Sequence, residues 1–314
     1  MDFGDGCIGC GRCAAACPTG ALEVGGFPVR LRIDPNARTP LKVDCERAPA
    51  AGADLRVPCL GGLSVSRLLA LRLAAEQREI HLLDHGWCAA CPASPNAKEH
   101  PAAKSLARAV ARLRDAGLAE PLMPKLQAAP ALYAVPMRAQ PRPSRRRLLN
   151  LFDASRPPAS ARFTPGPAPD RVLTLEILTR LATQYGGTVS EKLYHRVQVD
   201  ERCQGHAVCA AGCPTGALRL EHDEGNAVGL SHSSQLCIAC GHCERVCPDR
   251  ALRLERGVGH APRRWVARFD TSECTVCGTQ IRQSSQGARA VCQSCEKAAV
   301  LARSAFNQFY RREL

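Results

Sequence analysis

Two segments decide the fold of this chain: CQGHAVCAAGCPTGAL at residues 203–218 and CIACGHCERVCPDRAL at residues 237–252. The second has a complete C-x2-C-x2-C-x3-C-P pattern, formed by Cys237, Cys240, Cys243 and Cys247. The first keeps this spacing at Cys203, Cys209 and Cys213. His206 stands where its second cysteine would be. Three thiols in a tight loop point toward one centre, and two such runs in tandem predict two iron–sulfur clusters.

This arrangement resembles the bacterial ferredoxins that hold two clusters. The resemblance implies an α+β fold, cluster binding and the transfer of single electrons. In that family, the last cysteine of each run binds the cluster of the other run. The resemblance therefore implies one ligand set of Cys237, Cys240, Cys243 and Cys213. It implies a second set of Cys203, Cys209 and Cys247.

His206 leaves three outcomes open for the second set. If His206 does not bind, three thiolates would hold a 3Fe-4S cluster. If an imidazole nitrogen binds, a 4Fe-4S cluster forms, with a raised potential because a neutral ligand replaces a thiolate. The third outcome is an empty site. The segment CQGHAVC resembles the C-x-G-H-x-x-C segment of ferredoxins that feed bacterial haem monooxygenases, and this implies the three-iron form.

A third motif, CIGCGRCAAACPTGAL, begins near the N-terminus and has all four cysteines, at Cys7, Cys10, Cys13 and Cys17. Its segment CPTGAL recurs at residues 213–218, which indicates an internal repeat. Cys7, Cys10 and Cys13 should share one 4Fe-4S cluster. The fourth ligand is either Cys17 or one of the next four cysteines, and no second three-cysteine loop follows nearby.

Those next four cysteines, Cys45, Cys59, Cys88 and Cys91, fall in a predicted small α/β unit. An apolar strand ends in VPCLGG, a helix follows from SVSRLLAL, and a second strand ends in DHGWCAAC. Parallel strands would place the thiols at one edge. Residues 41–91 resemble the iron–sulfur delta subunit of methyl-viologen-reducing hydrogenases, which implies a 2Fe-2S cluster here. A zinc site or free buried thiols are the alternatives.

Near the C-terminus, CTVC and CQSC provide two C-x2-C pairs, Cys274 with Cys277 and Cys292 with Cys295. This spacing is typical of a four-thiolate metal site. The flanking WVARFD reads as a strand, and no C-P helix start follows, so we expect a zinc ribbon. Iron in a rubredoxin-like or cubane site is the alternative. A helix should close the chain.

The whole chain is therefore expected to be a multi-domain α+β protein with ferredoxin-like iron–sulfur domains. The predicted parts are a 4Fe-4S motif at 1–40, the α/β unit at 41–120, a Pro/Arg-rich linker at 121–170, a dicluster ferredoxin domain at 171–257 and the zinc-ribbon domain with its helix at 258–314. Within the linker, SRRRLLNLF at 144–152 resembles a twin-arginine export signal placed mid-chain. It reads as a solvated helix, or as a segment that contacts a partner or an anionic membrane surface.

The 19 cysteines lack a preceding signal-peptide pattern, so we expect metal ligands in a reducing cytoplasm rather than disulfides. No run of eighteen apolar residues predicts a membrane span. The formal net charge is +13, with every thiol counted as neutral. Clusters held by thiolates are anionic and would offset part of this excess.

The motifs favour a polyferredoxin that relays single electrons to or from an oxidoreductase with a flavin, molybdenum, haem or hydrogenase-type centre. No nucleophile pair or phosphate-binding loop is present, so we expect no substrate pocket and no independent catalysis. An iron–sulfur and zinc redox-sensing regulator and a metalloenzyme assembly factor are the alternatives. The lack of a helix-turn-helix pattern argues against a nucleic-acid partner.

Overall fold

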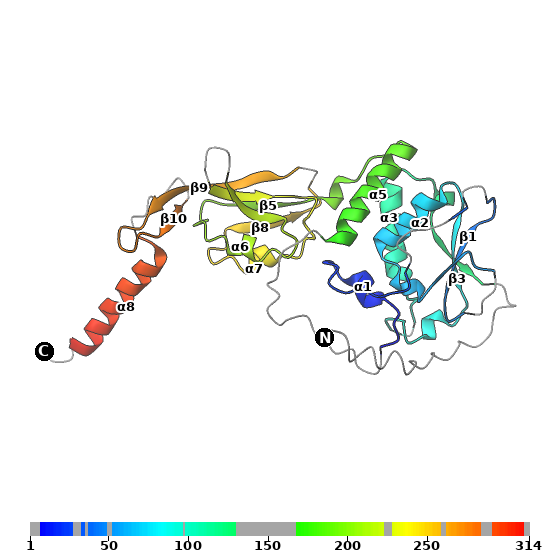
Figure 1. The fold of residues 1–314 in the computed structure, drawn as a ribbon, viewed down its shortest axis with the longest axis horizontal. Coiled ribbons are helices and arrows are strands. Elements are labelled where there is room, and N and C mark those ends of the chain that lie inside the picture. Colours follow the sequence, from blue (N-terminus) through cyan, green and yellow to red (C-terminus); the bar gives the residue numbers. More distant parts are fainter. Residues whose placement is uncertain are drawn as a thin grey trace. The chain divides into compact units, whose positions relative to one another are not determined.

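The structure is a computed structural model that describes residues 7–27, 33–34, 37–48, 52–96, 98–129, 168–222, 228–258, 262–283 and 291–310. The chain divides into two units, residues 1–190 and residues 191–314. Both units combine helices and strands, which confirms the α+β prediction at this level (Figure 1).

A parallel sheet forms the centre of the first unit. Its strands are β1 (Leu41–Cys45), β2 (Leu55–Val57), β3 (Ile80–Asp84) and β4 (Lys125–Ala128), in the order β2-β1-β3-β4. The sequence predicted β2 and β3 as neighbours, but β1 lies between them and pairs with both. The apolar residues of β1 are fully buried because this strand has a partner on each side.

Helices α2 (Val65–Ala75) and α3 (Ala103–Asp115) cover one face of this sheet, and α5 (Pro169–Tyr185) packs on α2 (Figure 1). The hydroxyl of Ser64 caps α2 by accepting the backbone N–H of Arg67 at 3.4 Å. Leu68 and Leu71 of α2 and Leu106 of α3 bury their side chains against the strands. The first unit also contains α1 (Arg12–Ala16) and the short 3-10 turns η1 (Leu60–Gly62), η2 (Cys88–Ala90) and η3 (Glu120–Leu122).

Helix α5 packs on α2 within the first unit, although the dicluster domain was predicted to begin at residue 171. Both Ser64 and Ser66, at the start of α2, donate hydrogen bonds to the carboxylate of Asp170 in the first turn of α5. The hydroxyl of Tyr185 donates to the carbonyl of Glu76, at a distance of 3.0 Å. The predicted linker from residue 121 thus contains β4 and the first turn of α5.

A βαβ segment occurs twice in the second unit, after the short 3-10 turn η5 (Glu191–Leu193). The first copy is β5 (His195–Val199), α6 (Val208–Ala211) and β6 (Leu218–His222). The second copy is β7 (Val228–His232), α7 (His242–Arg245) and β8 (Leu252–Arg256). The outer strands β5 and β8 pair antiparallel, as do the inner strands β6 and β7. The chain therefore folds as two copies with matching elements around a shared core.

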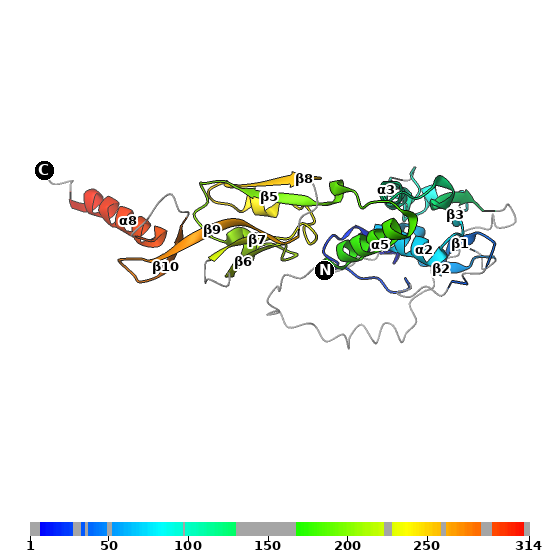
Figure 2. The ribbon, with the colours of Figure 1, turned by 90° about the horizontal axis from the view of Figure 1, so that it is seen from above.

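The C-terminal segment extends the inner sheet. Strand β9 (Arg264–Glu273) pairs with β7 along one edge and with β10 (Gln280–Gln283) along the other. The sheet order is β10-β9-β7-β6, so one sheet runs across residue 258, where the zinc-ribbon domain was predicted to begin. In Figure 2 this sheet is separate from the two-stranded sheet that β5 and β8 form. Helix α8 (Gln293–Tyr310) follows, and its side chains at 296–305 are exposed.

Residues 130–167, with the segment SRRRLLNLF at 144–152, lie outside the described residues, so its predicted roles stay predictions. Among the helices that the structure does describe, none has the length and apolar character that a membrane span requires.

Candidate metal centres

The three cysteine motifs share one backbone shape. In each motif, the residues on both sides of the second ligand position have positive φ. These residues are Gly9 and Gly11, Gly205 and Ala207, and Ala239 and Gly241. The third residue after the last cysteine also has positive φ, at Gly20, Gly216 and Arg250. For a non-glycine residue this conformation costs roughly 1–2 kcal/mol. The loop around His206 therefore keeps the shape of a cluster-binding loop although this places Ala207 in an unfavourable conformation.

One ligand set lies around a single pocket of the second unit. Cys213, from the first copy, and Cys237, Cys240 and Cys243, from the second copy, all line this pocket. Burial, and then the nearby Cys237, raise the pKa of Cys243 to about 12. The sulfur of Cys213 accepts the backbone N–H of Leu218 at 3.5 Å. Four thiols around one pocket fit a cluster with four thiolate ligands, one of them from the other motif.

The other three thiols of the two tandem motifs gather in the hydrophobic core of the second unit. Cys203 and Cys209 are buried, and Cys247 packs against the same core cluster. Burial, and then the neighbouring Cys203, raise the pKa of Cys209 to about 11. The sulfur of Cys247 accepts the backbone N–H of Ala251 at 3.3 Å. This set again joins two cysteines of one motif with the last cysteine of the other.

Both ring nitrogens of His206 have partners in the protein. Nδ1 lies 3.1 Å from the Asp249 carboxylate, and Nε2 lies 3.0 Å from Oε1 of Gln293 at the start of α8. Asp249 also accepts the backbone N–H of Gln204. The ring therefore sits at the second ligand position of its motif while both of its nitrogens contact other side chains.

The N-terminal motif lies against the α/β sheet. Cys10 packs against Cys59 and Cys91, and the guanidinium of Arg12 donates to the carbonyl of Ala93 at 2.7 Å. Cys7 and Cys13 are exposed. Cys17 lies 3.5 Å from the hydroxyl of Thr19, beside a separate cavity. The described contacts thus bring Cys10 to the four-cysteine edge and leave the fourth ligand of this motif open.

Four buried thiols meet at the carboxyl edge of the parallel sheet. Cys45 ends β1, and the others follow β2 and β3, at Cys59, Cys88 and Cys91. Burial raises the pKa of both Cys59 and Cys88 to about 12, and the other thiols of the group add to the rise. Buried thiols with raised pKa values stay protonated unless a bound cation stabilises the thiolates, so these four cysteines are candidate ligands for a metal or cluster.

Aromatic nitrogens surround this edge. Nε2 of His85 contacts the buried carboxylate of Asp44 at 3.0 Å, and the His85 ring stacks on Trp87. Asp84, Cys88 and His100 could together hold a metal ion by their spacing. However, Nδ1 of His100 accepts the backbone N–H of Ala102 at 3.1 Å, so the neutral ring has its proton on Nε2. Nε2 is then a donor and cannot be a metal ligand.

The four C-terminal cysteines converge on one point. Their sulfur atoms all lie within 4.8 Å of one another, and those of Cys277 and Cys292 are 3.7 Å apart. Zn–S bonds of about 2.3 Å in a tetrahedron give S···S distances of about 3.8 Å. Backbone N–H groups of Cys292 and Cys277 lower the pKa of Cys274 to about 6. The arrangement can hold one metal ion.

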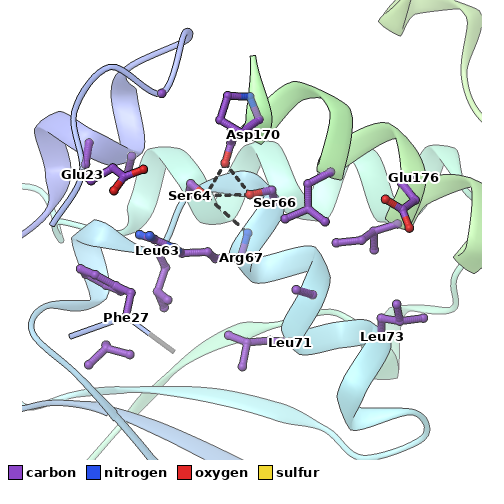
Figure 3. A pocket seen from close by; sticks show the side chains of 18 of the residues that line it. Glu23, Phe27, Leu63, Ser64, Ser66, Arg67, Leu71, Leu73, Asp170 and Glu176 are labelled. Atoms are coloured by element: carbon purple, nitrogen blue, oxygen red, sulfur yellow. Dashed lines mark hydrogen bonds between the residues drawn. The ribbon is translucent and has the colours of Figure 1, made fainter. Parts of the chain in front are cut away.

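The first unit also contains a cavity of about 550 Å³ that the sequence did not predict. Figure 3 shows Phe27, Leu63 and Leu71 along it, with Ser64 and Ser66 hydrogen-bonded to Asp170 at its upper rim. The wall joins α1, α2 and α5, which come from widely separated parts of the sequence. Its volume falls in the range of small-molecule sites.

Two segments of the chain match a known family. They are residues 5–23 and 232–253, and the family is the 4Fe-4S binding domain. The two ranges contain the complete motifs that begin at Cys7 and Cys237. The matches support 4Fe-4S binding at these two segments and are consistent with the bacterial ferredoxin type. No curated protein matches the chain, and neither comparison supports a resemblance of residues 41–91 to the hydrogenase delta subunit.

Proposed function

We propose that this chain is a multi-cluster electron-transfer protein, a polyferredoxin that relays single electrons to or from a partner oxidoreductase. The observation that supports this most is the pocket where Cys213 of one motif joins Cys237, Cys240 and Cys243 of the next. Crossed ligation of this kind brings two clusters close together, as electron transfer requires. Clusters bound here would supply reversible one-electron reduction at potentials set by their surroundings.

The set of Cys203, Cys209 and Cys247 is proposed to hold a 3Fe-4S cluster. His206 supports this assignment because Asp249 and Gln293 engage both of its ring nitrogens. To bind iron, His206 would have to give up the partner of whichever ring nitrogen becomes the ligand. If His206 keeps both partners, three thiolates remain, which suits a cluster that lacks one iron.

In the first unit, we assign a 4Fe-4S cluster to Cys7, Cys10 and Cys13 and a 2Fe-2S cluster to the four thiols of the sheet edge. Four buried cysteines at the carboxyl ends of three parallel strands support the second assignment. The contact of Cys10 with Cys59 and Cys91 makes the two sites neighbours. The partner would be an oxidoreductase in a reducing compartment such as the cytoplasm.

The C-terminal site is proposed to hold structural zinc. The sulfur spacing suits one tetrahedral ion, and four protein ligands leave no open position for a reacting molecule. The roles of the protein are therefore to hold thiolates, exclude water from the buried sets and supply N–H donors to the sulfurs.

Quantification of iron, acid-labile sulfide and zinc after anaerobic purification tests this function. Electron paramagnetic resonance (EPR) spectra of oxidised and dithionite-reduced protein should show a three-iron signal before reduction and several reduced clusters afterwards. Cys240→Ser should remove one 4Fe-4S signal and leave the three-iron signal. The matched control, Ser294→Ala, lies between metal ligands and should leave all signals and the metal content unchanged.

Protein with less than one iron per chain would contradict the proposal, as would clusters that dithionite and mediators cannot reduce. Zinc at below one equivalent would overturn only the C-terminal assignment.

A further inference from the structure

His232 occupies an inward position of the inner sheet. It ends β7 and lies between Leu218 of β6 and Arg264 of β9. The pairing with β9 shifts register between Leu230 and Ser231, but the pairing of β7 with β6 is uninterrupted there, so side chains alternate and His232 shares the face of Leu230. Leu230 is fully buried in the core cluster that contains Cys203 and Cys209. The imidazole therefore faces the cysteine side of the sheet.

The ring of His232 makes no hydrogen bond to the described residues. The side chain is 1% exposed, and neither Nδ1 nor Nε2 has a hydrogen-bond partner among the described residues. The same residue lines the pocket that Cys213, Cys237, Cys240 and Cys243 surround. An imidazole has at least one N–H in each protonation state at neutral pH, and a buried donor without an acceptor costs free energy.

The matching strand shows that packing alone does not require a polar side chain there. Strand β5 precedes the first motif of this unit as β7 precedes the second, and it ends in Val199. Val199 packs against the same core cluster as Leu230. A histidine in the corresponding place of β7 is explained if the pocket supplies an acceptor.

We propose that His232 donates an N–H hydrogen bond to a sulfur of the cluster held by Cys213, Cys237, Cys240 and Cys243, and raises its reduction potential. The inference rests on the proposed cluster at this site. Reduction adds one negative charge to the sulfur framework, and a hydrogen bond to an anion strengthens as its charge grows. The donor therefore stabilises the reduced state more than the oxidised state, as hydrogen bonds to cluster sulfurs do in general.

EPR-monitored redox titration of the full chain tests the proposal. His232→Phe keeps a planar ring and removes the donor, so the potential of the cluster that Cys240→Ser eliminates should fall. The ratio of reduced to oxidised cluster at a fixed ambient potential should drop by up to about tenfold, because the net strength of one hydrogen bond limits the difference between the two states. Ser231→Ala, on the opposite face of β7, is the matched control and should leave the potential unchanged.

A second measurement uses the wild-type protein, so it does not depend on whether a variant folds. In protein labelled with 15N-histidine, electron–nuclear double resonance on the reduced cluster should detect one histidine nitrogen and one proton that exchanges in D2O. An unchanged potential in His232→Phe with full cluster content would overturn the proposal, as would reduced wild-type protein without the nitrogen coupling. Wild-type protein without this cluster would instead overturn the proposed function.

Discussion

Removal of the metal ion from the C-terminal cysteines should unfold helix α8. Cys292 and Cys295 lie at its first turn, and the described side chains at 296–305 are exposed. An isolated helix of fewer than about 12–15 residues is only marginally stable in water. Helix α8 has 18 residues and is therefore little more stable unless it packs against other parts of the protein. Structural zinc contributes roughly 10–16 kcal/mol in small zinc-dependent folds. The metal is therefore the main source of stability for this helix.

The size of the effect follows from the fold. Helix α8 has 18 of the 72 residues in the α-helices that the structure describes, which is a quarter. Circular dichroism at 222 nm should lose about a quarter of its helical signal after a zinc-selective chelator is added anaerobically. The visible absorbance of the clusters, recorded in the same sample, should stay constant.

A double variant, Cys292→Ser with Cys295→Ser, provides the control. It should show the reduced signal from the start and should not respond to the chelator. Full helical signal after complete removal of zinc would refute the reasoning, because it would mean that α8 is held by contacts other than the metal.

Three further predictions follow from single side chains. Arg72→Met should lower the free energy of unfolding of the first unit by about 3 kcal/mol, measured by chemical unfolding. The buried guanidinium donates hydrogen bonds to the carbonyls of Glu76, Arg78 and Leu122, and the variant loses all of them. A loss below about 1 kcal/mol would contradict this. Ala207→Gly should raise the unfolding free energy of the second unit by about 0.5–1 kcal/mol. Glycine removes the strain of the positive φ, and its greater freedom in the unfolded chain offsets part of that gain. A lower unfolding midpoint would count against a strained loop. Zinc retention against a competing chelator should strengthen as pH rises above 6. The thiol neighbours of Cys295 raise its pKa to about 12, and zinc binding must release that proton. Retention that is independent of pH between 6 and 8 would disprove this prediction.

Spacing along the sequence was sufficient to predict the cluster loops, because each loop is closed by residues within a dozen positions. The C-x2-C-x2-C runs at Cys7 and Cys237 are confirmed as 4Fe-4S binding segments. The place of β1 between β2 and β3 could not be predicted in this way. It depends on pairing between segments such as Val43 and Leu82, which no local pattern specifies.

His232 and the cavity of the first unit show the same limit. The segment SHSSQ reads as a polar loop, and only the register of β7 with β6 and β9 makes His232 a buried residue beside four thiols. The cavity needs Asp170 beside Ser64, a contact across more than a hundred residues. The repeated motif indicates a cluster-type loop around His206, whereas no sequence pattern indicates the contacts of His206 with Asp249 and Gln293.

The return of α5 to the first unit determines how this protein can be divided. A fragment that begins at residue 171, the predicted domain border, would lack Asp170 and so lose the hydrogen bonds that Ser64 and Ser66 donate to it. If the chain is instead cut between residues 129 and 168, both the contact of α2 with α5 and these two hydrogen bonds remain available. Two fragments, 1–129 and 168–314, should therefore associate when they are produced together, and the second should bring its own clusters to the complex. A protein that can be reassembled from two parts would allow each half to be loaded with iron isotopes separately.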